Sequence, residues 1–394
     1  MRVLLLAPHP FFQPRGTPIA EAALLHVLSE RGDEVEVLTF AEGEEVAIPR
    51  CTIRRIPRIP GVRDLRPGFS AKKLLCDAVM LLQCLRRVRS GRFDVIHAVE
   101  ESAFMAAAAR ALFGVPYVYD MDSSLPQQMM EKYPVLAIVR RVMEAAESLV
   151  VRKSVAVVTV CQSLEEVARR YDPSRPVGRV EDFSLLSDGG GHPAERLAET
   201  IGKSGPIVLY AGNLEAYQGI DLLLAGFAHA VRKVPDVQAV IIGGDAGTIA
   251  RYRSLAGRLE VAESVHFVGP RPVAALGSYL EQAAVVVSPR TKGQNTPMKI
   301  YSYLDSGRPL LATRLPMHTQ VLDDDVAVLV EPHPMALGEG LVRLLNSDDR
   351  GASLAREAKR RVRAEFSREA FHRKMAAFYA RVEREVAADG RRAG

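Results

Sequence analysis

Residues 288–309, SPRTKGQNTPMKIYSYLDSGRP, contain the change of pattern that decides the fold. A short apolar run over residues 284–288 leads into a basic loop, and a helical pattern follows Pro297. A second apolar run begins at Pro309. A strand, a loop, a helix and a further strand are the repeating unit of parallel sheets, because parallel neighbours need a crossover connection.

The same alternation extends in both directions from this segment. Predicted strands lie at 3–6, 34–40, 93–98, 116–120 and 155–160, and then at 207–210, 238–242, 265–268, 284–288, 309–313 and 326–330. Predicted helices of the first half lie at 17–31, 71–89, 101–112, 135–152 and 162–171. The pattern predicts an α/β protein with two doubly wound parallel sheets, each covered by helices.

A change in composition divides the chain between the two sheets. Residues 172–177 are rich in proline, and residues 187–192 include three consecutive glycines. We therefore predict a first domain over residues 1–183, a linker over 184–204 and a second domain over 205–349. The carboxyl ends of the two sheets are expected to line a cleft, where open α/β folds bind their ligands.

The composition of the 394 residues fits a globular protein with more than one core. Hydrophobic residues make up 48% and charged residues 25%, which excludes a disordered chain. No apolar run has the length of a membrane span or fits a secretory signal, so the expected compartment is the cytoplasm. The four cysteines form no Cys-x-x-Cys pair, which argues against a disulfide framework or a thiolate metal site.

The net charge of +5 is concentrated near the end of the chain, where residues 350–394 contain 13 Lys or Arg and 6 Asp or Glu. We interpret this tail as helices with a solvated basic face, and nucleic acid is not an expected partner. A second basic and apolar helix is predicted over residues 71–89. We favour packing of that helix on a sheet, and peripheral association with the inner face of an anionic membrane is the alternative.

The loop after the strand at 284–288 is the strongest candidate for a binding site. Thr296 and Pro297 suit the cap and the first position of a helix, so free backbone amides are expected there. Arg290 and Lys292 add positive charge to the same loop. This combination predicts a phosphate or diphosphate site, and the alternative is a solvated basic loop.

Glycines follow two other strands of the second half. Gly212 comes directly after one strand, and Gly243 and Gly244 end the next, where a missing Cβ lets a ligand approach the backbone closely. Strand one is not followed by Gly-x-Gly-x-x-Gly, so a nicotinamide enzyme is not predicted.

Candidate residues of the first half also lie at the ends of strands. Gly16 and Thr17 open the first helix, with an ordinary capped loop as the alternative. Asp120 and Asp122 alternate after a strand, so only one can point into the cleft, and Glu100 follows the neighbouring run. An ordinary turn or cap role is the alternative for these acids. No cluster has the spacing of metal ligands, so no metal site is predicted.

These motifs resemble the GT-B glycosyltransferases of family 4, also called group 1, whose members retain anomeric configuration. The resemblance covers nearly the whole chain and rests on Gly-x-Leu-x-x-x-x-Gly at 212–219, Gly-Gly at 243–244, Phe-x-Gly at 267–269 and Tyr-Leu-x-Ser-Gly-x-Pro at 303–309. In the first half, residues 16–17 resemble the glycine-rich turn after strand one, and residues 93–97 resemble the strand that leads to the acceptor loops.

The resemblance implies two Rossmann-like domains that face a central cleft. The first would bind the acceptor and the second a nucleotide-diphosphate sugar, and helices within 350–394 would cross back to the first domain. It further implies metal-independent transfer of a sugar to a hydroxyl with retention, in which the leaving phosphate oxygen accepts the proton of the acceptor. The acceptor is expected to be a carbohydrate, a lipid-linked molecule or a small molecule.

Four positions depart from the family pattern. Asn213 and Gln218 stand where many relatives have the Arg and Lys that hold the diphosphate. Gln294 and Ser302 stand where relatives have two glutamates, of which the first holds the donor sugar and the second the ribose. We expect Gln294 to hydrogen-bond the sugar and Ser302 to bind the ribose more weakly.

Basic residues of nearby loops are expected to replace the lost cations. The predicted donor site comprises Gly212, Asn213, Gln218, Gly243, Gly244, Arg271, Arg290, Lys292, Gly293, Asn295, Thr296, Pro297, Met298, Lys299 and Ser302. Asp122 and Gln294 are the predicted catalytic residues, and the acceptor side comprises Gly16, Thr17, Glu100 and Asp120. No cofactor besides the donor substrate is expected. The alternatives are a sugar-nucleotide epimerase on the same fold and a non-catalytic scaffold that has lost the donor site.

Overall fold

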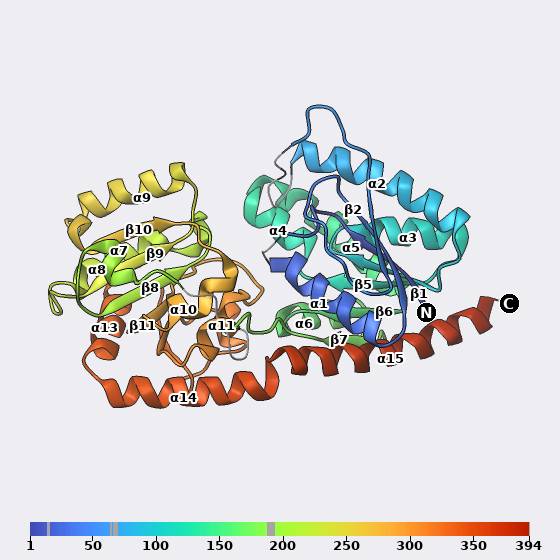
Figure 1. Ribbon diagram of the computed structural model, residues 1–394. Helices are drawn as coiled ribbons and strands as arrows, with labels where there is room; N and C mark the ends of the chain where they lie inside the picture. The colour runs from blue at the N-terminus through green and yellow to red at the C-terminus, as the bar shows by residue number, and fades with distance from the viewer. Residues whose placement is uncertain (14–15, 64, 66–69, 187–193, 394) are drawn as a thin grey trace. The chain divides into compact units, whose positions relative to one another are not determined.

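The computed structural model describes residues 1–13, 16–63, 65, 70–186 and 194–393. The chain forms two compact units, each with its own sheet (Figure 1). Unit 1 consists of Met1–Glu181 together with Phe371–Gly394, and unit 2 consists of Asp182–Ala370. The three glycines of the predicted linker lie outside the described residues.

Unit 1 contains a parallel sheet in the order β3-β2-β1-β4-β5-β6-β7. Its strands are β1 Arg2–Ala7, β2 Glu34–Thr39, β3 Cys51–Arg55, β4 Val95–Val99, β5 Tyr117–Met121, β6 Ala156–Thr159 and β7 Val177–Arg179. Because β1 lies between β2 and β4, the chain winds outward in both directions, which is the predicted doubly wound topology. The sequence analysis missed β3 and β7, which lie at the two edges of the sheet, where the periodicity is weak.

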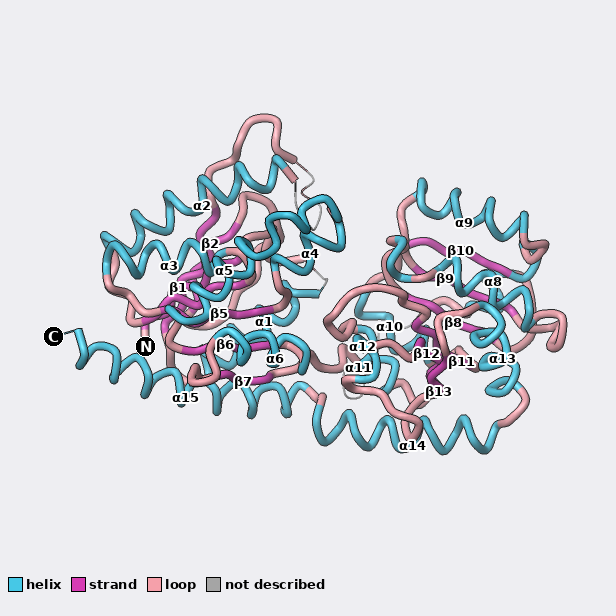
Figure 2. The backbone as a smooth tube through the Cα atoms, turned by 180° about the vertical axis from the view of Figure 1, so that it is seen from behind, coloured by secondary structure: helices cyan, strands magenta, loops and turns pink. Residues whose placement is uncertain are grey.

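Helices cover both faces of this sheet (Figures 1 and 2). They are α1 Gly16–Glu30, α2 Ala71–Ser90, α3 Ser102–Phe113, α4 Leu125–Lys132, η1 Pro134–Val139, α5 Arg140–Lys153, α6 Gln162–Tyr171 and the later part of α15 Arg368–Ala393. The helix predicted over 135–152 is thus a 3-10 segment followed by α5. Helix α2 packs beside α3, and it buries Cys76, Met80, Cys84 and Val88, as expected of a helix on a sheet.

Unit 2 contains a parallel sheet in the order β10-β9-β8-β11-β12-β13. Its strands are β8 Ile207–Ala211, β9 Gln238–Ile242, β10 Val265–Gly269, β11 Val285–Ser288, β12 Leu310–Thr313 and β13 Val328–Val330. Its helices are α7 Leu197–Ile201, η2 Ala216–Gln218, α8 Ile220–Ala230, α9 Ala246–Arg258, η3 Ala262–Ser264, η4 Val273–Ala275, α10 Leu276–Leu280, α11 Lys299–Asp305, α12 Pro316–Thr319, α13 Pro334–Leu345, α14 Asp348–Glu365 and the start of α15.

Alternate residues of the unit 2 strands pack into two cores, one on each face of the sheet. Tyr210 on β8 packs on one side with Phe227 of α8, and Leu209 packs on the other with Tyr301 and Tyr303 of α11. Strands β8 and β11 are neighbours at the centre, so the loops that follow them emerge next to each other. These loops contain most of the predicted donor site.

Candidate active site

The carboxyl ends of β8 and β9 meet through bare backbone. Gly212 has φ +153° and Gly243 has φ +112°, and a Cβ on Gly243 would collide with the carbonyl oxygen of Gly212. The Gly243 amide donates to the carbonyl oxygen of Gly269 over 2.8 Å, so the ends of three neighbouring strands are packed together. Glycine is therefore required here by close approach as well as by conformation.

Lys299, the first residue of α11, places its ammonium at this edge of the sheet. Its Nζ donates to the Tyr210 hydroxyl over 2.9 Å and to Gln218 Oε1 over 2.9 Å, and it lies 4.0 Å from the centroid of the Tyr210 ring. A Cβ on Gly212 would lie 3.0 Å from the same Nζ. Burial, with a contribution from Arg290, holds the pKa of Lys299 well below its usual range. A half-buried ammonium beside a second cation favours the binding of an anion.

Arg290 is folded over the loop that follows β11. Its guanidinium lies 5.1 Å from the centroid of the Tyr217 ring, donates from Nε to the Lys292 carbonyl over 2.7 Å and from Nη2 to Asn295 Oδ1 over 3.3 Å. A Cβ on Gly293, whose φ is +113°, would collide with this guanidinium. The structure thus brings together Arg290, Gly293 and Asn295, three residues of the predicted donor site.

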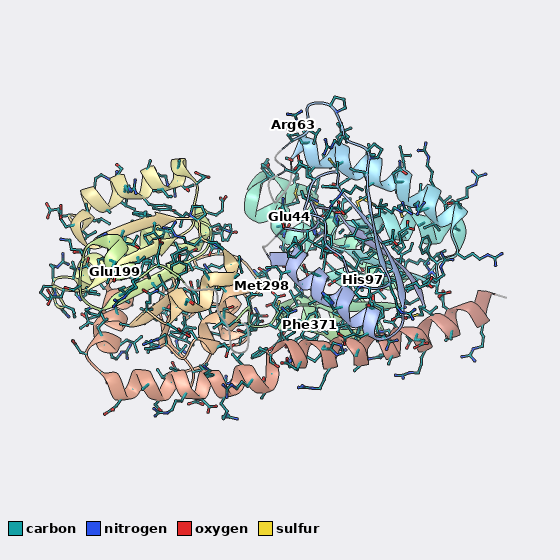
Figure 3. The ribbon with its side chains drawn as sticks, in the orientation of Figure 1. Glu44, Arg63, His97, Glu199, Met298 and Phe371 are labelled. Atoms are coloured by element: carbon teal, nitrogen blue, oxygen red, sulfur yellow. The ribbon has the colours of Figure 1, made fainter. Side chains whose placement is uncertain are left out.

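The start of α11 differs from the prediction. The helix begins at Lys299, and Met298 occupies the cap position without a side-chain hydrogen bond (Figure 3). Thr296 and Pro297 are buried in the preceding loop, and Thr296 Oγ1 has no hydrogen-bond partner within the described parts of the chain. The predicted capping role of Thr296 is therefore wrong, because its side chain points inward from an irregular segment.

Ser302 also lies away from any open surface. It is completely buried on α11, and its Oγ accepts a hydrogen bond of 3.0 Å from the backbone amide of Leu185. The hydroxyl stabilises the segment that precedes α7 within unit 2, and its burial does not support the expected contact with a ribose. Sequence spacing gives the position on the helix but not the packing of the preceding segment against it.

Some of the remaining predicted donor residues are exposed, and one, Arg271, forms an ion pair. Asn213, Lys292 and Gln294 are exposed, and the side chain of Asn213 accepts from the Glu215 amide over 3.3 Å. Gly244 lies beside Leu214 at the end of β9. Arg271 forms an ion pair of 2.7 Å with Glu195 and donates to carbonyls of its own turn after the edge strand β10. Its charge is already compensated, so we do not count it among the cations of the site.

In unit 1, Asp120 belongs to a buried chain of hydrogen bonds. Its Oδ2 lies 2.9 Å from Nε2 of His97 (labelled in Figure 3), and Nδ1 of His97 lies 2.8 Å from the hydroxyl of Tyr379 on α15. Asp122 is half-buried beyond the end of β5. Glu100 donates its amide to the Asp120 carbonyl over 2.9 Å, and its Oε1 accepts from Ser123 over 3.3 Å. The strand ends thus bring Asp120 and Glu100 together.

Unit 1 differs from the prediction at Thr17, and it contains a buried acid, Glu21, that the sequence analysis did not identify. Thr17 does not cap α1, because the helix already includes Gly16. Glu21 on α1 is buried, with Oε2 at 2.9 Å from His9 Nε2, and its Oε1 has no hydrogen-bond partner in the described residues. Burial raises the pKa of Glu21. In the sequence, Glu21 is an acid within the helical run Ala20–Leu25, and the same pattern is expected of an exposed glutamate. In the described ranges, no group of His, Cys, Asp and Glu is arranged to hold a metal ion.

Two family models match the chain, "Glycosyl transferase 4-like domain" over residues 20–180 and "Glycosyl transferases group 1" over residues 205–347. The D-inositol 3-phosphate glycosyltransferase of Corynebacterium glutamicum is 26% identical over 400 residues, and 91% of each chain is covered. The phosphatidyl-myo-inositol mannosyltransferase of Mycobacterium tuberculosis is 25% identical over 359 residues, and 88% of each chain is covered.

Solved structures show the same fold. The sucrose-phosphate synthase of Thermosynechococcus elongatus superposes with a TM-score of 0.78 at 19% identity, covering 97% of this chain and 98% of its own. HepE of Anabaena, solved with UDP-glucose, gives a TM-score of 0.72 at 17% identity, covering 96% and 99%. Together with the two parallel sheets, these similarities confirm the predicted fold class.

Proposed function

The chain belongs to the group 1 glycosyltransferases of the GT-B fold, and we propose that it takes its sugar from a nucleotide diphosphate bound by unit 2. The acceptor is a hydroxyl, transfer retains the anomeric configuration, and no metal takes part. The proposal is supported chiefly by one observation, the ammonium of Lys299 at the carboxyl ends of β8 and β11.

Lys299 supplies a cation where the motif residues lack one. The family resemblance assigns a diphosphate-binding lysine to the position of Gln218, which is neutral here. Lys299 Nζ donates a hydrogen bond to the side chain of that same Gln218, so a positive charge lies 2.9 Å from Gln218 Oε1. Arg290, which contributes to the lowered pKa of Lys299, adds a second charge.

The two cations fit the chemistry of transfer. Cleavage of the anomeric bond leaves negative charge on the diphosphate, and fixed positive groups in a desolvated site lower that barrier. Gly212 has no side chain beside the ammonium of Lys299, so the diphosphate can approach the backbone there, whereas the space at Gly243 is filled by the Gly212 carbonyl. The leaving phosphate oxygen takes the acceptor proton, and the site then needs no separate protein base. We keep Asp122 and Gln294 as the candidates for contacts with the donor sugar.

The acceptor class is proposed from the relatives. Two are named for action on inositol 3-phosphate and on phosphatidyl-myo-inositol, so we propose a polyol or a lipid-linked hydroxyl as the acceptor. Asp120 and Glu100 are the candidates for hydroxyl contacts in unit 1 because carboxylates accept hydrogen bonds from them.

We further propose that unit 1 rests on an anionic membrane surface. None of the helices in the described part of the chain has the length and hydropathy that a bilayer crossing needs. Exposed apolar side chains gather on α2 and on η1 with α5, namely Leu74, Leu75, Leu82, Val135, Ile138, Val142 and Leu149. Exposed cations flank them, namely Lys72, Arg86, Arg89, Arg140 and Arg141. Helices with this combination bind anionic lipid at its interface.

Vesicle sedimentation tests the membrane proposal. The protein is expected to sediment with vesicles of mixed phosphatidylglycerol and phosphatidylcholine, and Leu82→Glu is expected to reduce the bound fraction. Met335→Glu is the matched control, because Met335 is an exposed apolar side chain on unit 2. Equal sedimentation of all three proteins would contradict the proposal.

Calorimetric titration with UDP, GDP and ADP tests the donor proposal. At least one nucleotide is expected to bind, and the corresponding nucleotide sugars are then screened against polyol and lipid acceptors by release of nucleoside diphosphate. A new sugar nucleotide formed without any acceptor would instead favour an epimerase. Absence of binding by all three nucleotides would contradict the proposed donor class.

A further inference from the structure

A buried group of side chains lies behind the loop that carries Arg290. Ser288 ends β11, Thr313 ends the neighbouring strand β12, and His318 lies on α12. All three are completely buried. None of them was identified from the sequence, because each looks like an ordinary polar residue at the end of a strand or in a short helix.

The hydrogen bonds in this group have one consistent direction. Ser288 Oγ donates to His318 Nε2 over 3.0 Å. His318 Nδ1 lies 2.8 Å from the Thr313 carbonyl, which can only accept, so the proton of the neutral ring is on Nδ1. Thr313 Oγ1 then donates to the carbonyl oxygen of Arg290 over 2.6 Å. Every polar atom in the series is satisfied with a neutral imidazole.

The loop is held at two further points. The side-chain amide of Gln320 donates to the Gln294 carbonyl over 2.8 Å, and the Thr291 amide donates to the Tyr217 carbonyl over 2.9 Å. Contacts from Gln320, which follows α12, and from η2 therefore fix the backbone on both sides of Lys292. The guanidinium of Arg290 lies over Tyr217 as a result of this backbone path.

We propose that His318 and Thr313 are positioning residues of the diphosphate site. Neither touches the donor; together they fix the carbonyl of Arg290, and through it the direction in which its guanidinium points. A preformed loop spares the ligand the cost of ordering it, so the series contributes to affinity rather than to chemistry. The inference rests on the proposed function, because it requires that the loop binds a diphosphate.

Thr313→Val and Thr313→Ser form the matched pair that tests the inference. Valine keeps the shape and removes the donor to the Arg290 carbonyl, whereas serine keeps the hydroxyl. The dissociation constant of inorganic pyrophosphate, measured by calorimetry on the full chain, is expected to rise about three- to tenfold in Thr313→Val. In Thr313→Ser it is expected to remain within about twofold of the wild type. Thr39→Val, which removes a buried strand-end hydroxyl that donates to the His9 carbonyl over 2.6 Å in unit 1, is the control for a general loss of stability.

The outcomes separate the inference from the function on which it rests. No pyrophosphate binding by the wild type, or full binding by Lys299→Met, would contradict the proposed function itself. Binding that is weakened by Lys299→Met but equal in the two Thr313 variants would overturn the inference alone. An equal loss in Thr39→Val would also overturn it, because the effect would then follow stability and not the position of Arg290.

Discussion

Replacement of Lys299 by Met is the most direct perturbation of the proposed site. Methionine keeps the length and apolar stem of the side chain and removes the charge that lies 2.9 Å from Gln218 Oε1. A hydrogen bond to a charged group contributes about 1.5 to 3 kcal/mol, and tenfold in affinity is about 1.4 kcal/mol. We therefore expect the dissociation constant of the nucleoside diphosphate to rise about 10- to 150-fold.

The stability of the unliganded protein is expected to respond differently. The variant leaves Gln218 Oε1 without its donor but also removes a half-buried ammonium that lies beside the neutral side chains of Gln218 and Tyr210 and near the cation of Arg290. The two effects oppose each other, so the free energy of unfolding is expected to change by no more than about 1 kcal/mol. A large loss of affinity with little loss of stability distinguishes a ligand-binding charge from a structural one.

The assay is calorimetric titration with the nucleotide that binds the wild type, paired with urea denaturation. Lys292→Met is the matched control, because this lysine lies on the same loop and is exposed. Exposed charges contribute about 0.2 to 1 kcal/mol, so its affinity loss is expected to be at most about fivefold. Equal affinity in Lys299→Met and the wild type would refute the assignment of the ammonium to the anion.

Binding of a nucleoside diphosphate is expected to be accompanied by proton uptake at pH values between the lowered pKa of Lys299 and its usual pKa, because an anion raises the lowered pKa. Calorimetry in two buffers of different ionisation enthalpy measures this uptake, and a binding enthalpy that is the same in both buffers would contradict the prediction. Burial, with Arg290 and Lys299 nearby, lowers the pKa of His318 from 6.5 to about 4, so the folded state binds fewer protons than the unfolded state between these values. The contribution of His318 is complete above pH 6.5 and is lost as the pH falls through 4, by about 3 kcal/mol in total; urea denaturation at pH 4 and pH 7 should show a smaller difference in His318→Gln. Gly243→Ala is expected to lower the free energy of unfolding of unit 2 by more than about 2 kcal/mol, because the added Cβ would meet the Gly212 carbonyl. Gly307 has φ +70° but no atom within 4 Å of an added Cβ, so Gly307→Ala is expected to lower it by about 1 kcal/mol. Similar unfolding curves for the two variants would contradict this packing.

The sequence predicted the two sheets because buried parallel strands leave a strong signal. The central strand β8 is a continuous apolar run whose residues are all buried, and β1 is apolar and buried from Val3 onward. The edge strands β3 and β7 were missed because one is only half-buried and the other has three residues. Helix boundaries were predicted less accurately than strands. Thr296-Pro297 has the composition of a helix start, but α11 begins two residues after Pro297, at Lys299.

Side-chain direction was the part of the site that the sequence did not determine. Lys299 and Ser302 lie three residues apart on α11. The side chain of Ser302 is completely buried, whereas the ammonium of Lys299 reaches the hydroxyl of Tyr210 on β8. Arg271 was considered as a replacement cation on charge alone, and its pairing with Glu195 depends on a segment 76 residues earlier. Charge and spacing thus identify candidates, and packing decides which of them face a ligand.

The position of Lys299 follows from the topology of the sheet. Gln218 and Lys299 are 81 residues apart in the chain, but β8 and β11 are adjacent, so the loop after one strand and the helix after the other meet at one edge. A cation lost from the first element can therefore be supplied by the second without any change in the backbone of either. An anion bound at this edge is attracted by charges on either element. The neutral residues Asn213 and Gln218 therefore do not by themselves imply that the donor site is lost. The same reasoning predicts that Gln218→Lys would place two ammonium groups together and weaken folding unless an anion is bound, which nucleotide-dependent stabilisation in a thermal melt would detect.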